Sequence, residues 1–406
     1  MCVLFLLAPA LDAQASRWIL QNPGILPADF IVLGDLSLDG QRFVSVELPD
    51  RGLTNSRIPL GATPDYEIGP FDNEEPIQRV SAVTRPEAWF VSHLHYEALP
   101  VLSDGRGVVV AVLDDGVKLH HPALFTQMWV NQAETAGNKK DDDNNGYVDD
   151  VYGYDFVERK GDPQGRFSAS HGTFCAGLIA ATVEATGEGK TKAQGVAPGA
   201  KIMALRILGG PASLQPSFLS TAAEAIKYAV DNGAKVISNS WRIYRSWGDY
   251  NPTPERVALL ESAIAYAEKR GVIFVAGAGN ESNDVGLPGA DTAIPVALPG
   301  HANMVGVAAS DESDARASFS NYGLGYIHFA APGVNMVSTE TDDTWGKGSG
   351  TSYSTPLVAG ILARGLSAGM SPTAAIQKLR ESADPSSVWA GKVESGGVVD
   401  LVQYLK

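Results

Sequence analysis

Three residues of the types that form a serine nucleophile system each lie in a distinctive motif. Asp114 lies near the end of the apolar run Val-Val-Val-Ala-Val-Leu-Asp-Asp-Gly that starts at Val108. His171 begins His-Gly-Thr, and Ser352 lies in Gly-Thr-Ser-Tyr-Ser-Thr-Pro. A serine hydroxyl becomes an effective nucleophile when an imidazole takes its proton, and a carboxylate on the other ring nitrogen orients that imidazole. In this interpretation Ser352 attacks, His171 transfers the proton and Asp114 orients His171.

These residues follow one another in the order Asp, His, Ser, which is the order of the subtilisin triad. Taken singly, each motif would indicate no more than a turn or a helix start. Together with their flanking segments, they make roughly residues 85–406 resemble the subtilisin-like serine proteases (peptidase S8 family). The resemblance implies an endopeptidase that hydrolyses peptide bonds in a broad range of proteins and peptides through an acyl-enzyme intermediate.

The resemblance also implies a role for Asn280, which ends the run Val-Ile-Phe-Val-Ala-Gly-Ala-Gly-Asn. Its side-chain amide and the backbone N–H of Ser352 would form the oxyanion hole, which stabilises the tetrahedral intermediate. Asn280-Glu281-Ser282 also matches a glycosylation sequon, an interpretation that a buried catalytic asparagine disfavours. Gly279, next to Asn280, is expected to contact the substrate.

The segment Val-Ile-Ser-Asn-Ser-Trp that ends at Trp241 resembles the strand end along which the family binds extended peptides. Ser240 and Trp241 would line this cleft, where pairing with the peptide backbone gives affinity with little side-chain preference. Arg242 stands where family members usually have glycine, and its guanidinium would either crowd the cleft or select acidic residues. The alternative is that Trp241 is a core aromatic residue and Arg242 a surface cation.

An acidic insertion, Asp-Asp-Asp-Asn-Asn-Gly-Tyr-Val-Asp-Asp, precedes His171. It places oxygen ligands at alternating positions around a turn-forming glycine, as calcium loops do, but Tyr152 stands where an EF-hand requires glutamate. The resemblance implies a structural calcium ion, because several subtilisin-like proteases have a similar insertion; a solvated acidic run is the alternative. The expected ligands are Asp141, Asp143, Asn145, the Tyr147 carbonyl and Asp149.

Several positions beside the catalytic motifs depart from the commonest family pattern. Asp115 replaces threonine or serine, although the kexin-like branch also has Asp-Asp-Gly. Tyr353 replaces a methionine, which removes an oxidation-sensitive thioether beside the nucleophile. Cys175 resembles a cysteine of the kexin-like branch, and we expect a small buried residue there rather than a second nucleophile.

The elements that position these residues alternate between strands and helices. A helix at 221–232 stops at a glycine and is followed by a strand at 235–238. His171 and Ser352 would open helices, and Pro356 would lie in a first turn, where a missing N–H costs little. The repeated βαβ units predict an α/β fold, and the resemblance makes it the three-layer subtilisin-like fold, a mostly parallel sheet flanked by helices. The site would lie at the carboxyl ends of the strands.

The chain divides into three regions. Residues 1–15 contain a short apolar run and an Ala-x-Ala ending, which suggests a secretory signal and a secreted or periplasmic protein. Residues 16–80 have proline-rich and acidic stretches, and form either an inhibitory propeptide, which would make the chain a zymogen, or an ordered N-terminal extension. Residues 81–406 would be the catalytic domain.

Composition is compatible with one large catalytic domain. The 406 residues are 44% hydrophobic, which is enough for a substantial core, and no segment after residue 15 is long and apolar enough to span a bilayer. The net charge of −15 argues against nucleic acid and anionic membranes as partners and favours calcium. The two cysteines, Cys2 and Cys175, predict no disulfide framework, and we expect a monomer.

Two other functions are compatible with the same residues. The chain could be a catalytically silent or latent scaffold that binds peptides, which Arg242 and the N-terminal region would favour. It could also be a peptide ligase or cyclase, because an amine can resolve the same acyl-enzyme. The mass of the product separates ligation from hydrolysis, which adds one water.

Overall fold

The structure is a computed structural model that describes most of the chain. The described residues are 17–24, 26, 30–47, 62–71, 73–74, 76–81, 87–95, 103–165, 169–182, 194–210, 217–243, 257–287 and 293–406. The predicted secretory signal at 1–15 lies outside the described residues.

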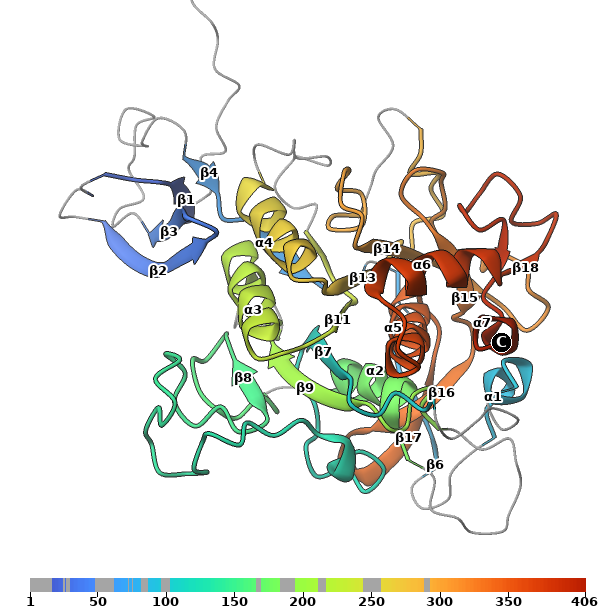
Figure 1. Cartoon of the computed structure of the whole chain (residues 1–406), viewed down its shortest axis with the longest axis horizontal. Coiled ribbons are helices and arrows are strands. Elements are labelled where there is room, and N and C mark those ends of the chain that lie inside the picture. The colour runs from blue at the N-terminus through green and yellow to red at the C-terminus, as the bar shows by residue number, and fades with distance from the viewer. Residues whose placement is uncertain are drawn as a thin grey trace, which may run out of the picture.

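A nine-stranded sheet forms the centre of the molecule, in the strand order β18-β19-β15-β14-β13-β11-β7-β9-β8 (Figure 1). Every neighbouring pair is parallel except β18 with β19, which confirms the predicted fold class. The strands are β7 (Val109–Asp114), β8 (Gly153–Asp155), β9 (Lys201–Arg206), β11 (Val236–Asn239), β13 (Ile273–Gly277), β14 (Met304–Ser310), β15 (Phe329–Pro332), β18 (Asp384–Pro385) and β19 (Gly397–Val398).

Helices cover both faces of this sheet (Figure 1). In β7, Ala111 and Leu113 belong to an apolar cluster with α3 and α4, whereas Val110 and Val112 belong to a second cluster with α2 and α5. Successive side chains of a strand point to opposite faces, so β7 is buried on both sides, which explains its continuous apolar sequence. The helices are α1 (Trp89–His93), α2 (Ser170–Ala180), α3 (Leu219–Asp231), α4 (Ala258–Lys269), α5 (Thr351–Ser367), α6 (Pro372–Glu381) and α7 (Leu401–Tyr404), with short 3-10 turns at Phe125–Gln127 and Thr341–Asp343.

The predicted helix at 221–232 and strand at 235–238 correspond to α3 and β11. The helix begins earlier than predicted, at Leu219, so that Ser220 lies inside its first turn. None of the helices in the described ranges is long and apolar enough to cross a membrane.

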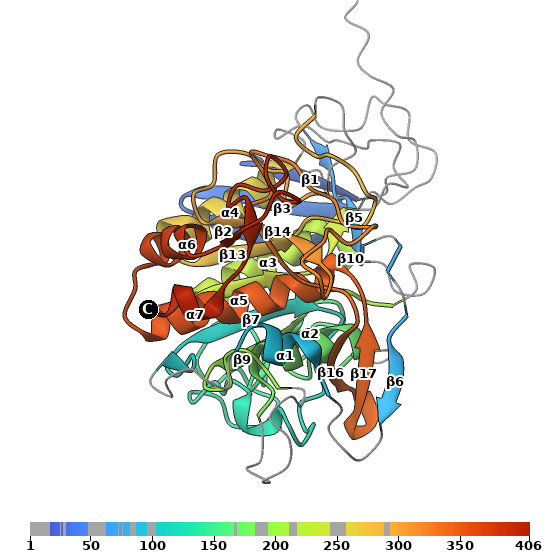
Figure 2. The same ribbon diagram turned by 90° about the vertical axis from the view of Figure 1, so that its right-hand side faces the viewer.

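The N-terminal region forms an antiparallel sheet of its own, in the order β2-β3-β1-β4. Its strands are β1 (Arg17–Gln21), β2 (Ile31–Leu38), β3 (Gln41–Glu47) and β4 (Thr63–Pro64). This sheet lies against the outer side of α3 and α4, with β2 contacting both helices (Figures 1 and 2).

Two small antiparallel sheets join the N-terminal region to the rest of the molecule. In the first, β5 (Glu67–Gly69) lies between β10 (Ser217–Phe218) and β12 (Arg242–Ile243). In the second, β6 (Gln78–Ser81) adds to the hairpin of β16 (Met336–Glu340) and β17 (Thr344–Gly348), and Figure 2 shows these three strands side by side. The chain from β4 to β6 therefore crosses the surface of the larger domain.

Candidate active site

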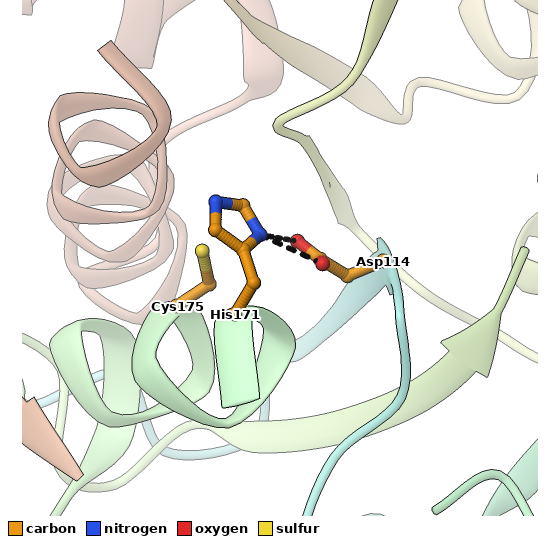
Figure 3. A group of neighbouring side chains, drawn as sticks. All are labelled: Asp114, His171 and Cys175. Atoms are coloured by element: carbon orange, nitrogen blue, oxygen red, sulfur yellow. Dashed lines mark hydrogen bonds and ion pairs between the residues drawn. The ribbon is translucent and has the colours of Figure 1, made fainter. Parts of the chain in front are cut away.

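The three predicted catalytic residues come from three separate elements. Asp114 is the last residue of β7, His171 is the second residue of α2 and Ser352 is the second residue of α5. Asp114 is 1% exposed and Ser352 is fully buried. His171 Nδ1 lies 2.8 Å and 2.9 Å from the two carboxylate oxygens of Asp114, as Figure 3 shows. With Nδ1 donating to Asp114, the Nε2 nitrogen is free to act as the base.

The Asp-Asp-Gly motif explains how β7 and α2 are held together. The second aspartate, Asp115, accepts a hydrogen bond from the backbone N–H of Gly172, 2.8 Å away, in the first turn of α2. This N–H has no partner within the helix, so a carboxylate beside it stabilises the helix start. Gly172 is required for space, because a Cβ there would lie 2.1 Å from the Gly116 carbonyl oxygen.

The position of Pro356 differs from the prediction. We expected it in a first helical turn, but α5 begins at Thr351, and Pro356 lies inside the helix. A proline cannot donate to the carbonyl four residues earlier, which is that of Ser352. This carbonyl instead accepts hydrogen bonds from Ser240 Oγ at 2.9 Å and from Cys175 Sγ at 3.6 Å. Because Pro356 cannot donate to it, the Ser352 carbonyl is fixed by hydrogen bonds from two neighbouring segments instead.

Cys175 is buried, as predicted, with 1% of its surface exposed. It lies beside His171 in Figure 3, and the two residues and Asp114 could in principle ligate a metal ion. Burial raises the pKa of the Cys175 thiol well above its ordinary value, so the thiol stays protonated. A protonated thiol is a poor ligand and a poor nucleophile, which leaves Cys175 as a packing residue and hydrogen-bond donor.

Asn280 lies next to the start of α5 and is 2% exposed. Its side-chain carbonyl accepts hydrogen bonds from the Thr351 backbone N–H at 3.0 Å and from Thr351 Oγ1 at 2.9 Å. These bonds orient the side chain, whose amide nitrogen is buried without a hydrogen-bond partner. An oriented, unpaired donor is what an oxyanion hole requires. Gly279 has a φ of +98°, and a Cβ there would lie 2.6 Å from Asn321 Nδ2.

A residue that the sequence analysis missed lies at the catalytic centre. Glu74 accepts a hydrogen bond from Ser352 Oγ, and its other carboxylate oxygen lies 3.3 Å from His171 Nε2. Asn73, beside it, donates to the backbone carbonyl of Asn280 at 3.3 Å. His171 Nε2 makes no hydrogen bond of its own in the described structure. Glu74 thus contacts both Ser352 Oγ and His171 Nε2, the two atoms that would otherwise interact with each other. The sequence contains no local signal for a contact between such distant segments.

The charges around His171 shift its pKa. Burial, the largest single influence, would lower the pKa of this imidazole, and the negative charge of Asp114, that of Glu74 and the hydrogen bond to Asp114 act together in the opposite direction. The net pKa lies well above the ordinary value of 6.5. A protonated imidazole cannot accept a proton from a serine, and the Glu74 carboxylate both accepts a hydrogen bond from Ser352 and adds to the charge that favours the protonated form of His171.

The predicted substrate segment lies where β12 pairs with β5. Ser240 and Trp241 are both buried, and Ser240 contacts the Ser352 carbonyl rather than the cleft. Arg242 is only 2% exposed, and its backbone pairs with Gly69, so it is not the surface cation that we considered.

The Arg242 side chain is committed to an ion pair. Its Nη1 lies 2.7 Å from Glu281 Oε1, and Asn321 Nδ2 donates to the other oxygen of Glu281 at 2.5 Å. The guanidinium is thus neutralised rather than presented to an acidic substrate residue. Since Glu281 follows Asn280, the ion pair also connects β12 to the loop that carries Asn280.

The acidic loop brings together only part of the predicted ligand set. Asp141 and Asp143 lie with Glu134, which the sequence analysis missed, with one carboxylate oxygen of each within 4.8 Å of the others. Asp149 instead accepts hydrogen bonds from the backbone N–H groups of residues 138 and 139. The backbone N–H of Asn145 donates to Asp141 and Asp143 at 3.0 Å each, so Asn145 lies beside them. Asn145 and the Tyr147 carbonyl remain predicted ligands.

Comparison with known proteins agrees with this geometry. Residues 105–395 match the model of the subtilase family. The chain is 31% identical to thermitase from Thermoactinomyces vulgaris, over 79% of this chain and 94% of thermitase. It is 35% identical to the thermophilic serine proteinase of Bacillus sp. (strain AK1), over 71% of this chain and 60% of that protein. It is 34% identical to subtilisin Savinase from Lederbergia lenta, over 64% of this chain and 76% of that protein. The chain belongs to the subtilase family and is a serine-type endopeptidase.

Proposed function

We propose that this endopeptidase acts through Asp114, His171, Ser352 and Asn280, and that the N-terminal region holds it latent. The catalytic proposal rests mainly on the two contacts between the Asp114 carboxylate and His171 Nδ1. The buried Asn280 amide nitrogen, which has no hydrogen-bond partner, and Ser352 complete the set. This is the constellation that acyl transfer requires: an oriented base, a nucleophile and an oxyanion donor.

The reaction follows from these positions. Ser352 Oγ attacks the scissile carbonyl carbon and passes its proton to His171 Nε2, while Asp114 stabilises the imidazolium through Nδ1–H. The carbonyl oxygen becomes negative and accepts hydrogen bonds from Asn280 Nδ2 and the Ser352 N–H. The C–N bond breaks as His171 protonates the leaving amine. His171 then takes a proton from water, which attacks the acyl-enzyme and releases Ser352. Because β12 offers its backbone to the peptide, we expect many proteins and peptides to be substrates.

The latency proposal rests on what the N-terminal region occupies. Strand β5 lies between β10 and β12 and pairs with both, and Glu74 accepts a hydrogen bond from the hydroxyl of Ser352. The region 16–80 is in this proposal an inhibitory propeptide rather than a mere extension, because a peptide substrate and β5 compete for the same strand edge. Its removal frees Ser352, His171 and the edge of β12 together.

We propose that a calcium ion is held by the acidic loop, through Glu134, Asp141 and Asp143. Three carboxylates converge there, and Glu134 Oε2 has no hydrogen-bond partner. Flexible carboxylate sets of this kind suit calcium better than magnesium, which demands near-ideal octahedral geometry. The ion would stabilise the fold of the loop that precedes β8. We also propose that the protein acts after export, on the basis of the apolar run and Ala-x-Ala ending of residues 1–15.

The experiment that tests this function is covalent labelling with a fluorophosphonate, read by intact mass. The full chain is compared with its Ser352→Ala variant, before and after the N-terminal region is removed by limited proteolysis. We expect slow labelling of the full chain, fast labelling of the shortened chain and no labelling of the variant. Absence of an adduct in both forms of the wild type would overturn the catalytic proposal and favour a silent scaffold.

Three further outcomes complete the test. Equal labelling rates before and after removal of the N-terminal region would refute latency. Peptide products that lack the added water would show ligation instead of hydrolysis. Loss of labelling after calcium chelation, with recovery on adding calcium, would support the metal proposal, whereas indifference to chelation would count against it.

A further inference from the structure

The first turn of α2, which carries His171, has no cap of its own. Helices usually begin with a serine, threonine, aspartate or asparagine whose side chain accepts from a free N–H group. The residue before α2 is Ala169, whose side chain makes no such bond. The start of the helix is therefore fixed by groups from other elements, and one of them is the carboxylate of Asp115.

A second support for this turn is β16, which lies beside α2 (Figure 2). Ser338 Oγ donates to the Phe174 carbonyl at 2.7 Å, and Thr339 Oγ1 donates to the Thr173 carbonyl at 2.8 Å. Gly177 makes this close approach possible, because a Cβ there would lie 2.1 Å from Thr339 Oγ1. Side chains of the strand thus reach the backbone of the helix within its first two turns.

Glu340, the last residue of β16, contacts the residue that precedes His171. Its Oε2 accepts a hydrogen bond from Ser170 Oγ at 2.6 Å. Its Oε1 accepts from the backbone N–H of Thr341 at 2.6 Å and from Thr341 Oγ1 at 2.9 Å. Glu340 is only 5% exposed. Because both carboxylate oxygens are hydrogen-bonded, the carboxylate has a fixed orientation, and Ser170 is anchored to it.

Stability alone does not explain a carboxylate at the end of β16. Burying a carboxylate is costly even when it is hydrogen-bonded, and an apolar side chain of similar size would fill the same space without that cost. The position of Glu340 relative to the catalytic base does explain it. His171 needs its Nδ1 beside Asp114, and a small rotation of the first turn of α2 would swing the imidazole out of line, which is enough to slow a reaction considerably.

We propose that Glu340 is a positioning residue for catalysis, which holds the first turn of α2 through Ser170 so that His171 keeps its contact with Asp114. This inference rests on the proposed role of His171 as the base and names a further residue on which that role depends. Glu340 does not touch the reacting atoms or the peptide. Its loss should therefore lower kcat and leave KM nearly unchanged.

The first test measures kcat and KM for fluorescently labelled casein, after limited proteolysis has removed the N-terminal region. We expect Glu340→Leu to lower kcat about tenfold or more, with KM within about twofold of wild type. Glu340→Gln keeps an oxygen that can accept from Ser170 Oγ, so its kcat should stay within about threefold of wild type. Asp342→Asn is the matched control, because it removes a nearby carboxylate that is 71% exposed.

Three outcomes of this test overturn the inference. They are an unchanged kcat in Glu340→Leu, a change confined to KM, and a loss in Glu340→Gln or Asp342→Asn as large as that in Glu340→Leu. The melting temperature of each variant shows whether it is folded.

The second test is a double-mutant cycle with Ser170→Ala, which removes the donor and leaves the carboxylate in place. If Glu340 acts through Ser170, Ser170→Ala lowers kcat as much as Glu340→Leu does, and the double variant is no slower than either single variant. Losses that multiply would show that the two residues act independently and would refute the proposal. Should Glu340→Leu fail to fold, Ser170→Ala alone decides, because an unchanged kcat in that variant contradicts the inference.

The third test observes His171 directly, by the low-field proton resonance of its Nδ1–H group in the full chain. A proton held between Nδ1 and the Asp114 carboxylate gives a distinct resonance, which should persist in Glu340→Gln and broaden or disappear in Glu340→Leu. An identical resonance in both variants overturns the inference. In every negative outcome a fluorophosphonate adduct on Ser352 of the wild type leaves the proposed function intact, whereas its absence refutes that function itself.

Discussion

The two largest sheets of this protein are stabilised in different ways. The nine-stranded sheet is covered on both faces, and two extensive apolar clusters bury its central strands. The N-terminal sheet has a small apolar cluster of its own, made of Trp18, Leu20, Val44 and Val46. It also contributes Ile19, Leu38 and Phe43 to the cluster that contains α3 and α4, and Asp39 pairs with Lys269 and Arg270 at the end of α4. Because its own cluster is so much smaller, we expect the N-terminal sheet to unfold or detach more readily than the nine-stranded domain.

A pair of tryptophan substitutions provides the strongest test of this comparison. Trp389 is fully buried in the large core, and Trp18 is 1% exposed in the small cluster. Each change to alanine should lower the free energy of unfolding of its own region by roughly 3–5 kcal/mol, through lost apolar burial and a residual cavity. Trp389→Ala should lower the melting temperature of the catalytic domain. Trp18→Ala should leave that transition in place and accelerate Ser352 labelling in the full chain.

A single transition that both variants lower equally, measured by calorimetry, would contradict the comparison. It would mean that the N-terminal sheet and the catalytic domain unfold as one cooperative unit.

The second prediction concerns pH and Asp65, which is fully buried against the start of α3. Burial raises the pKa of Asp65 from 3.8 to about 6, although hydrogen bonds from Ser220 oppose the shift. A raised carboxyl pKa means that docking favours the protonated form, so its contribution is complete below pH 3.8 and is lost as the pH rises to about 6. We expect the cleaved N-terminal segment to bind roughly a hundredfold more weakly across this window.

The matched variant is Asp65→Asn, which cannot titrate. Its dissociation constant, measured by displacement of the segment from processed enzyme, should vary much less between pH 4 and pH 7. An equally steep pH profile for the variant would show that another group controls docking.

The third prediction concerns Glu74. Replacing its carboxylate with the neutral amide in Glu74→Gln removes one of the negative charges that raise the pKa of His171. Since labelling requires neutral His171, the pH of half-maximal labelling of the full chain should fall, and the rate at neutral pH should rise about tenfold. Val80→Ala is the control, because it shortens a side chain of β6 that is 42% exposed and carries no charge. An unchanged pH midpoint would show that Glu74 does not influence the base in solution.

The smallest expected effect is that of Asp39→Asn. This change removes both ion pairs with α4, whose basic side chains are exposed by 65% and 39%. Exposed pairs contribute little and are screened by salt. Binding of the cleaved segment should weaken about two- to fivefold at low ionic strength, and the difference should vanish in 1 M salt. A larger loss that persists in salt would mean that this edge of the sheet is a principal anchor.

The candidate catalytic residues could be located from the sequence because each lies in a local pattern. Asp114 follows a continuous apolar strand, and His171 and Ser352 each open a helix, as α2 and α5 confirm. The alternation of strands and helices likewise predicted a parallel sheet, which the structure confirms. Periodicity and turn residues report the backbone within a few residues of one another, so these features are encoded locally.

Only the tertiary structure decided which distant segments meet at the site. The carboxylate of Glu74 reaches Ser352, the ring of Phe71 reaches Gly277, and Arg242 pairs with Glu281 instead of facing a substrate. The predicted calcium loop shows the same limit, because Glu134 lies with Asp141 and Asp143 whereas Asp149 does not belong to this group of carboxylates. The sequence by itself determined the family and the chemistry, since both reside in short motifs. The proposed latency depends on contacts between segments far apart in the chain, and the path of the backbone, rather than any local pattern, brings those segments together.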